Sequence, residues 1–337
     1  MSNQPTPAIS GLYPWLDEQW VFFERCLELD RLAHAQIIEG PAGCGKSKLA
    51  KAMVAKLLCR AKERYACGAC RSCKLLEGGA HPELIDVTFE TDPKTGRLRS
   101  VITVDQVRRM IEQLQLTTSI SSRKVTCISP ADRMHSSAVN ALLKSLEEPA
   151  GEDTVLILVT DSPGRLPITI RSRCQVISVN QPDRAQTAEW LAETTGKEAA
   201  EINAAIDAAG GSPLRARTFL VSPELDAYQQ VRESLAKLLL RPGSVSIAAA
   251  QLAELDVTDA WRWLSALTGD LAKAVMMDAL PDWIPANIQL DSKSLLQLQQ
   301  QADINRQLSN TTVRGDLLLQ TWLIHWAELV IGSRERP

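Results

Sequence analysis

The sequence has no excess of positive charge. Its 37 lysines and arginines are set against 40 aspartates and glutamates, which gives a formal net charge of −3. A protein that coats nucleic acid through a broad surface needs a basic balance, so that class of protein is disfavoured. Any contact with DNA would have to be local or arranged by partner proteins.

Long apolar runs are also missing. No stretch of about 18 apolar residues occurs, so we expect no membrane span. Residues 1–7 are polar and contain proline, unlike the apolar segment of a signal peptide. We therefore expect a cytoplasmic protein. Its 337 residues, 45% of them hydrophobic, are enough for two or three globular domains.

One phosphate-binding motif is complete. The pattern G-x-x-x-x-G-K-[ST] is matched without a gap by Gly40, Pro41, Ala42, Gly43, Cys44, Gly45, Lys46 and Ser47. Residues 34–39 read as a short strand, and the residues after Lys46 have the apolar spacing of a helix. This order directs backbone N–H groups toward phosphate, with Lys46 at the terminal phosphates and Ser47 at Mg²⁺. The alternative is a glycine-rich turn that binds no ligand.

The acid that should work beside this motif is missing. A P-loop ATPase needs a carboxylate at the end of a second strand to hold Mg²⁺ and orient water. The candidate strand, residues 124–128, runs instead into Ser129 and Pro130. Asp132 follows, but strand geometry displaces it by about 6–7 Å. The sequence therefore predicts that ATP or ADP is bound without hydrolysis, and leaves open whether Mg²⁺ accompanies it.

A cluster of cysteines predicts a metal site. Two overlapping C-x-x-C steps follow a further cysteine, and the four members are Cys59, Cys67, Cys70 and Cys73. Four thiolates suit a structural, tetrahedral Zn²⁺ site with no open position for catalysis. The alternatives are disulfides, which a reducing compartment disfavours, or a redox pair, which would not need four cysteines. We expect the scattered Cys26, Cys44, Cys127 and Cys174 to be small buried hydrophobic residues.

Strand and helix patterns alternate up to about residue 180, as in a doubly wound α/β sheet. Residues 84–87 and 176–179 read as further strands, and Ser136 and Ser137 could cap a helix that Pro149 stops. Residues 154–160 form a near-continuous apolar run, typical of a central parallel strand. Beyond residue 182 the pattern is helical, with one apolar stripe from Trp261 to Val275 and another from Leu319 to Val330. The stripes predict a helical core, and some of the six tryptophans there could instead lie at an interface.

Two further motifs make the sequence similar to a known family. The run Leu142-Leu143-Lys144-Ser145-Leu146-Glu147-Glu148-Pro149, together with Arg171-Ser172-Arg173-Cys174, resembles the clamp-loader branch of the AAA+ ATPases over about residues 10–220. Bacterial members carry a zinc module at the place of the cysteine cluster. The acid-free strand, Tyr13-Pro14-Trp15-Leu16 and His81-Pro82 single out one subunit of the bacterial DNA polymerase III clamp loader.

The resemblance implies a fold in three parts. An α/β AAA+ P-loop domain with a zinc-binding module near residues 59–73 would occupy residues 1–180. A small helical lid would follow at 181–222, and an all-α C-terminal collar, which oligomerises, at 223–337.

The resemblance also implies roles for three residues. Arg173 would be an arginine finger that reaches in trans to ATP on a neighbouring motor subunit, rather than an ordinary surface arginine. Thr160 would sense the γ-phosphate, unless it is a structural cap at the strand end. Arg215 would be a second sensor at the nucleotide, unless it only begins a helix.

Three functions remain open, and the first is preferred. The chain would be a catalytically silent subunit of a hetero-oligomeric clamp loader, with tau/gamma motor subunits and a delta subunit, within the DNA polymerase III holoenzyme. It would help to place a sliding clamp on primer-template DNA. The second function is an active motor ATPase of the same complex. The third is a zinc-dependent nucleic-acid binder, which the acidic balance disfavours.

Overall fold

The computed structural model describes residues 11–61, 63–93, 96, 98–148, 151, 153–222, 224–281, 283–285, 288–308 and 314–329. The chain divides into two compact units. The first comprises residues 1–187 and 212–214, and the second comprises residues 188–211 and 215–337. In these described ranges, no helix is both long enough and apolar enough to span a membrane.

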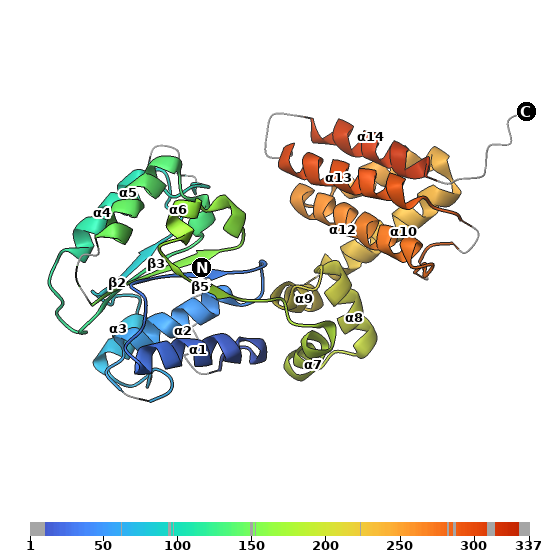
Figure 1. The fold of residues 1–337 in the computed structure, drawn as a ribbon. Helices are drawn as coiled ribbons and strands as arrows, with labels where there is room; N and C mark the ends of the chain where they lie inside the picture. Colours follow the sequence, from blue (N-terminus) through green and yellow to red (C-terminus); the bar gives the residue numbers. More distant parts are fainter. Residues whose placement is uncertain are drawn as a thin grey trace, which may run out of the picture. The chain divides into compact units, whose positions relative to one another are not determined.

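The first unit is built on a five-stranded sheet in the order β2-β3-β4-β1-β5, with every neighbouring pair parallel. Figure 1 shows this sheet between two layers of helices. The strands are β1 (Ala35–Glu39), β2 (Leu84–Val87), β3 (Lys124–Ile128), β4 (Thr154–Thr160) and β5 (Gln175–Ser178). Because the strands are parallel, their carboxyl ends share one edge of the sheet, where open α/β sheets bind ligands.

Two apolar cores lie on opposite faces of this sheet. One face is covered by α1 (Asp17–Glu28) and α2 (Lys46–Leu58), and α3 (Arg71–Glu77) packs on α2. The other is covered by α4 (Val104–Leu114), α5 (Ser136–Glu147) and α6 (Ile168–Arg171). All seven residues of β4 are buried, as expected for a central strand covered on both faces. Three 3-10 turns complete this unit: η1 (Pro14–Leu16), η2 (Ala131–Arg133) and η3 (Pro163–Arg165).

The α/β alternation predicted from the sequence is confirmed, and the differences are local. The predicted strands at 84–87, 124–128 and 154–160 have the observed bounds, whereas the last strand, predicted at 176–179, both begins and ends one residue earlier. The predicted cap of α5 at Ser136 and Ser137 is wrong. His135 precedes the helix and accepts a hydrogen bond from the N–H of Ser137. The predicted stop at Pro149 lies outside the described residues.

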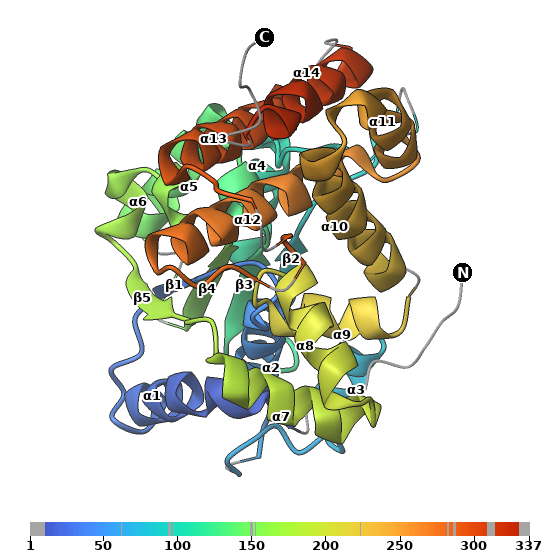
Figure 2. The same cartoon turned by 90° about the vertical axis from the view of Figure 1, so that its right-hand side faces the viewer.

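All the secondary-structure elements in the described residues of the second unit are helices. Figure 2 shows α12, α13 and α14 packed side by side, and α12 with α13 is the most extensive helix pair of the chain. Part of α7 (Arg184–Thr195) and the first residues of α9 (Pro213–Leu220) belong to the first unit. The other helices are α8 (Ala199–Ala208), α10 (Glu224–Leu240), η4 (Pro242–Ser244), α11 (Val245–Ala253), α12 (Val257–Met276), α13 (Ser292–Leu308) and α14 (Gly315–Ala327).

The apolar stripes of the second unit form its core, as predicted. Trp261 meets Trp322 edge-on, and Trp322 stacks on Trp326 with ring centroids 5.7 Å apart. The indole N–H of Trp326 donates to the carbonyl of Leu235 in α10 at 3.0 Å. Five of the six tryptophans after residue 180 are buried within the chain, so only the half-buried Trp283 keeps exposed surface for a partner. Val330, predicted to continue one stripe, lies outside the described residues.

Candidate functional site

The phosphate-binding motif lies where β1 ends and α2 begins, at the carboxyl edge of the sheet. Gly40 has φ +150°, and a Cβ placed there would lie 2.0 Å from the carbonyl oxygen of Val179. Gly45 has φ +92°, and its Cβ would lie 2.6 Å from the Tyr13 ring. Both positions exclude any larger residue, because backbone conformation and close packing act together. The glycines thus let the loop turn tightly beneath the Tyr13 ring.

The carbonyl groups of the loop are all held from inside the chain. Lys46 Nζ donates to Gly40 and Pro41, Ser212 Oγ to Ala42, the Leu214 N–H to Gly43, and the Trp15 indole N–H to Cys44. In the part of the chain that the structure describes, the N–H groups of residues 42–47 donate to no protein acceptor. Carbonyls tied back and N–H groups left available are the polarity that an anion site needs.

Lys46 is 3% exposed, and its ammonium group already has three acceptors. Nζ lies 2.7 Å from the Gly40 oxygen, 2.5 Å from the Pro41 oxygen and 2.6 Å from Oδ1 of Asp161. Asp161 follows the last residue of β4, and sequence analysis did not identify it. Its place after a predicted central strand was the available signal, because strand ends in a parallel sheet meet at one edge.

No carboxylate stands directly at the tip of β3. Ser129 donates its N–H to the Val87 carbonyl, and Pro130 leads into η2. Asp132, within η2, is bound to the neighbouring strand. Its Oδ1 accepts from Thr160 Oγ1 at 2.9 Å and from the Asp161 N–H at 3.3 Å. Thr160 is buried and its Oγ1 accepts from the Ser162 N–H, so its present contacts are those of a strand-end cap.

Arg173 lies at the amino-terminal ends of the strands, whereas the phosphate-binding loop lies at their carboxyl-terminal ends. It precedes β5, and Gln175 at the start of β5 pairs with Gln36 near the start of β1. Gly40 is four residues further along, about 13 Å at strand spacing. Nη2 of Arg173 lies 2.8 Å from Glu147 Oε1, and Nη1 donates to the Thr169 carbonyl at 3.0 Å.

Arg215, in the second unit, has an acidic partner there. Its Nη2 lies 2.5 Å from Oδ1 of Asp259, and its guanidinium stacks over the Phe219 ring. Burial raises the pKa of Asp259, and the charge of Arg215 opposes this rise. Sequence reasoning missed Asp259, which lies on α12 and carries no local motif.

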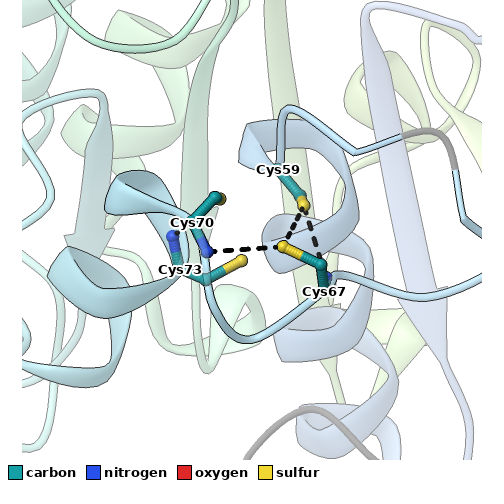
Figure 3. Close-up of side chains that lie close together, drawn as sticks. All are labelled: Cys59, Cys67, Cys70 and Cys73. Carbon is teal, nitrogen blue, oxygen red and sulfur yellow. Dashed lines mark hydrogen bonds between the residues drawn. The ribbon is translucent and has the colours of Figure 1, made fainter.

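The four cysteines predicted as metal ligands come together in space. Their sulfur atoms all lie within 4.8 Å of one another, and Figure 3 shows Cys59 after α2 opposite Cys70 and Cys73 at the start of α3. Zn–S bonds of about 2.3 Å place tetrahedral sulfurs about 3.8 Å apart, and the Cys59 and Cys67 sulfurs are 3.6 Å apart. The residues therefore fit a Zn²⁺ ion without a change of fold.

Backbone N–H groups point at these sulfurs and favour their thiolate forms. Cys59 Sγ accepts from the N–H groups of Ala61 and Cys67, each at 3.4 Å. The Ala69 N–H lowers the pKa of Cys67. Burial acts to raise the pKa of Cys70, but the N–H groups of Cys73 and Arg60 outweigh it and bring that pKa to about 6. Burial raises the pKa of the deepest thiol, Cys73.

A buried polar network joins the cysteine cluster to the sheet. His81 Nε2 donates to Ser72 Oγ at 2.8 Å, and Ser72 Oγ donates to the Leu58 carbonyl at the end of α2. The Glu83 N–H donates to His81 Nδ1, which fixes the neutral tautomer. Burial lowers the pKa of His81, although the Glu83 charge opposes this. The sequence singled out His81 only through its family resemblance and gave no role to Ser72.

The other cysteines are less buried than predicted. Cys44, within the phosphate-binding motif, is fully buried, but Cys26, Cys127 and Cys174 are half-buried. The prediction of four small buried residues is therefore right only for Cys44. Cys174 is half-buried because it lies in the loop before the edge strand β5, which has a neighbour on one side only.

Comparisons with known proteins show which family the chain resembles. The family model described as "DNA polymerase III, delta subunit" matches residues 15–183. The chain is 39% identical to DNA polymerase III subunit delta' of Pseudomonas aeruginosa over 73% of this chain and 71% of that protein. It is 31% identical to the subunit delta' of Yersinia pestis over 93% of this chain and 95% of that protein.

One solved structure supports the fold. The DNA polymerase III gamma subunit-related protein of Thermotoga maritima aligns with 92% of this chain and 99% of its own, with a TM-score of 0.50 and 17% identity. At 17% sequence identity, this similarity supports the fold and nothing about function.

Proposed function

The chain belongs to the family of DNA polymerase III delta' subunits, and on that premise we propose that it is a non-hydrolysing subunit of the clamp loader. In this proposal it assembles with tau/gamma motor subunits and a delta subunit. It helps to open a sliding clamp and place it on primer-template DNA. Its own contribution to ATP hydrolysis is Arg173, offered in trans to the site of a neighbouring motor subunit.

The observation that carries the proposal is the contrast between the two strand ends. The loop after β1 has the polarity of a phosphate site, whereas β3 runs into Ser129 and Pro130 with no carboxylate. Asp132 is the nearest acid in sequence, and its Oδ1 already accepts hydrogen bonds from the Thr160 hydroxyl and the Asp161 N–H. Without an acid to hold Mg²⁺ and orient water, bound nucleotide is not cleaved.

The position of Arg173 supports action on another chain. It stands at the amino edge of the sheet, whereas Lys46 stands at the carboxyl edge. About 13 Å separates Arg173 from the phosphate-binding loop of its own chain, which is too far for the arginine side chain to reach a phosphate there. The Arg173 side chain is 36% exposed, so a neighbouring subunit can approach it. The planar, permanent charge can then offset the charge that develops during phosphoryl transfer.

The zinc site and the second unit have supporting roles in this proposal. Zn²⁺ held by the four cysteines stabilises the segment between α2 and β2, and four protein ligands leave it no catalytic position. Arg215 and Thr160 would contact nucleotide, and the helices after residue 222 would form the collar that joins subunits. Contact with DNA and with the clamp would come mainly through the assembled complex, given the net charge of −3.

The test is a clamp loader reconstituted with tau/gamma, delta and either wild-type chain or Arg173→Ala. The clamp- and DNA-stimulated ATPase rate is measured, with subunit assembly checked by gel filtration. An arginine finger contributes on the order of 10³–10⁵ in rate at its site. We therefore expect a large loss at the adjacent motor site with assembly unchanged. Arg173→Lys should not restore the rate, because an ammonium group lacks the planar fork.

The matched control is Arg165→Ala. Arg165 is exposed and lies in η3, within the same segment between β4 and β5. Loss of ATPase activity in both variants would point to a general disturbance of this segment. An unchanged rate in Arg173→Ala would remove the finger from the proposal.

A further inference from the structure

The ammonium group of Lys46 has no N–H left for a phosphate. A lysine side chain carries three donors, and the three acceptors are the Gly40 oxygen, the Pro41 oxygen and Asp161 Oδ1. A phosphate oxygen can reach Nζ only by displacing one of them. The two carbonyls are backbone groups of the loop itself, whereas the carboxylate belongs to a side chain. Asp161 is 52% exposed and can leave by a side-chain rotation.

Asp161 is also aimed at this position by its surroundings. Its N–H donates to Asp132 Oδ1, and the preceding Thr160 donates to the same oxygen. The side chain of Asp132 is 5% exposed, so the carboxylate that accepts these two hydrogen bonds is itself held inside the protein. The Ser162 N–H in turn donates to Thr160 Oγ1. The chain after β4 is therefore fixed on both sides of Asp161, and its carboxylate reaches Lys46 from the strand end next to β1.

We propose that Asp161 determines the nucleotide specificity of the loop: its carboxylate stands in for a terminal phosphate, so that the loop binds nucleoside diphosphate in preference to triphosphate. The inference rests on the proposed function, in which the loop holds nucleotide without cleaving it. A diphosphate uses the N–H groups of residues 42–47 and leaves the Asp161–Lys46 pair in place. A triphosphate brings a further anionic group to Lys46 and must expel the carboxylate.

Electrostatics decide the direction of this preference. Two like charges about 4 Å apart repel strongly near a protein surface, where the effective dielectric constant is about 20. Part of the repulsion is relieved when Asp161 rotates into solvent, but its ion pair with the buried Lys46 is then lost. Both routes oppose the triphosphate and leave the diphosphate nearly unaffected.

The test is isothermal titration calorimetry of the full zinc-loaded chain with ADP and with ATP, each with Mg²⁺ and with EDTA. The proteins are wild type, Asp161→Asn, Asp161→Ala and the control Asp153→Asn. Asp153 is exposed and stands at the other end of β4, so it gives the same change of charge away from the loop. Neither Asp161 variant is expected to disturb folding, because the side chain is half exposed.

We expect wild type to bind ADP at least about tenfold more tightly than ATP, and both Asp161 variants to tighten ATP binding by about tenfold or more. ADP affinity should change by less than about threefold, and Asp153→Asn should behave as wild type.

Three results would overturn it: a wild-type preference for ATP, no effect of Asp161→Asn on ATP affinity, or no binding of ADP by the wild-type chain. These results are separable from those for the arginine finger. The finger is judged by the ATPase rate of a neighbouring subunit, whereas Asp161 is judged by nucleotide affinity of the chain alone. If Arg173→Ala leaves the ATPase rate unchanged but Asp161→Asn alters ATP affinity, the arginine finger is contradicted and the role of Asp161 is still supported.

Discussion

Arg173 and Glu147 form an ion pair in which Nη2 lies 2.8 Å from Oε1, so the arginine proposed to act in trans already has an acidic partner in its own chain. Glu147 is the last residue of α5, and Arg173 lies in the loop that precedes β5. Both side chains keep substantial exposure, so the pair adds little stability but limits where the guanidinium points.

Glu147→Gln should therefore act on orientation. We expect the free energy of unfolding to fall by less than about 1 kcal/mol, as for an exposed ion pair. In the reconstituted clamp loader, the partner's kcat should fall several-fold, and less than in Arg173→Ala, because an arginine without a fixed partner loses pre-organisation. The steady-state ATPase rate measures this, with the adjacent Glu148→Gln as control. Equal effects of the two substitutions would exclude a specific role for Glu147.

The isolated chain should not turn over ATP. The strand end at Ser129 and Pro130 supplies no carboxylate to position Mg²⁺ or water. A coupled assay of purified wild type and Lys46→Ala should give the same background rate. Turnover that Lys46→Ala abolishes would show that another acid serves the site and would make the chain a motor subunit.

Removal of zinc should destabilise the first unit. We expect about one zinc per chain by elemental analysis. A chelator or Cys73→Ser should lower the Tm of the first unit by about 4–8 °C, the equivalent of about 2 kcal/mol for a domain of this size. Cys174→Ser, outside the cluster, serves as the control. A chain that contains no zinc, or a chelated chain with unchanged Tm, would contradict the metal site.

Acid should weaken the first unit through Glu83. This carboxylate is 2% exposed, and although its burial acts to raise its pKa, the N–H groups of Ser119, Ile120 and Ser121 outweigh that and lower the pKa. A lowered folded-state pKa gives stability that is present above the unfolded value, about 4.3, and is lost as pH falls through the folded value.

The substitution Glu83→Gln tests this linkage. The substitution should lower the free energy of unfolding by about 2–3 kcal/mol at neutral pH. The N–H groups that now bond two charged carboxylate oxygens would find only one neutral amide oxygen. The difference in unfolding free energy between wild type and variant, from urea titrations at several pH values, should shrink as pH falls below about 4. A difference that stays constant with pH would show that Glu83 is not charged in the folded state.

Trp326→Phe tests the core of the second unit. The change removes the N–H bond to the Leu235 carbonyl and leaves a small gap beside Trp322. The cost should be about 2–4 kcal/mol from the lost volume and the unpaired carbonyl. Urea unfolding followed by circular dichroism measures it. The half-buried Trp283 provides the control, since Trp283→Phe should cost under about 1 kcal/mol.

Local patterns predicted the elements well, for physical reasons that act within a few residues. The apolar run at 154–160 gave the central strand β4, and the C-x-x-C spacing gave the thiol cluster. Contacts between distant segments escaped prediction. Asp161 reaches Lys46, and Asp259 reaches Arg215, only because the fold brings separate elements together. No periodicity or motif records such a pairing, since each partner alone looks like an ordinary surface acid.

Helix α2 joins the phosphate-binding motif directly to the cysteine cluster. Its first residue is the lysine of the phosphate loop, and Cys59 of the cysteine cluster follows its last residue. The 13 residues of α2, Lys46 included, form one helix of about 20 Å. A single helix therefore sets the separation of the cysteine cluster and the phosphate-binding motif, with no flexible linker between them.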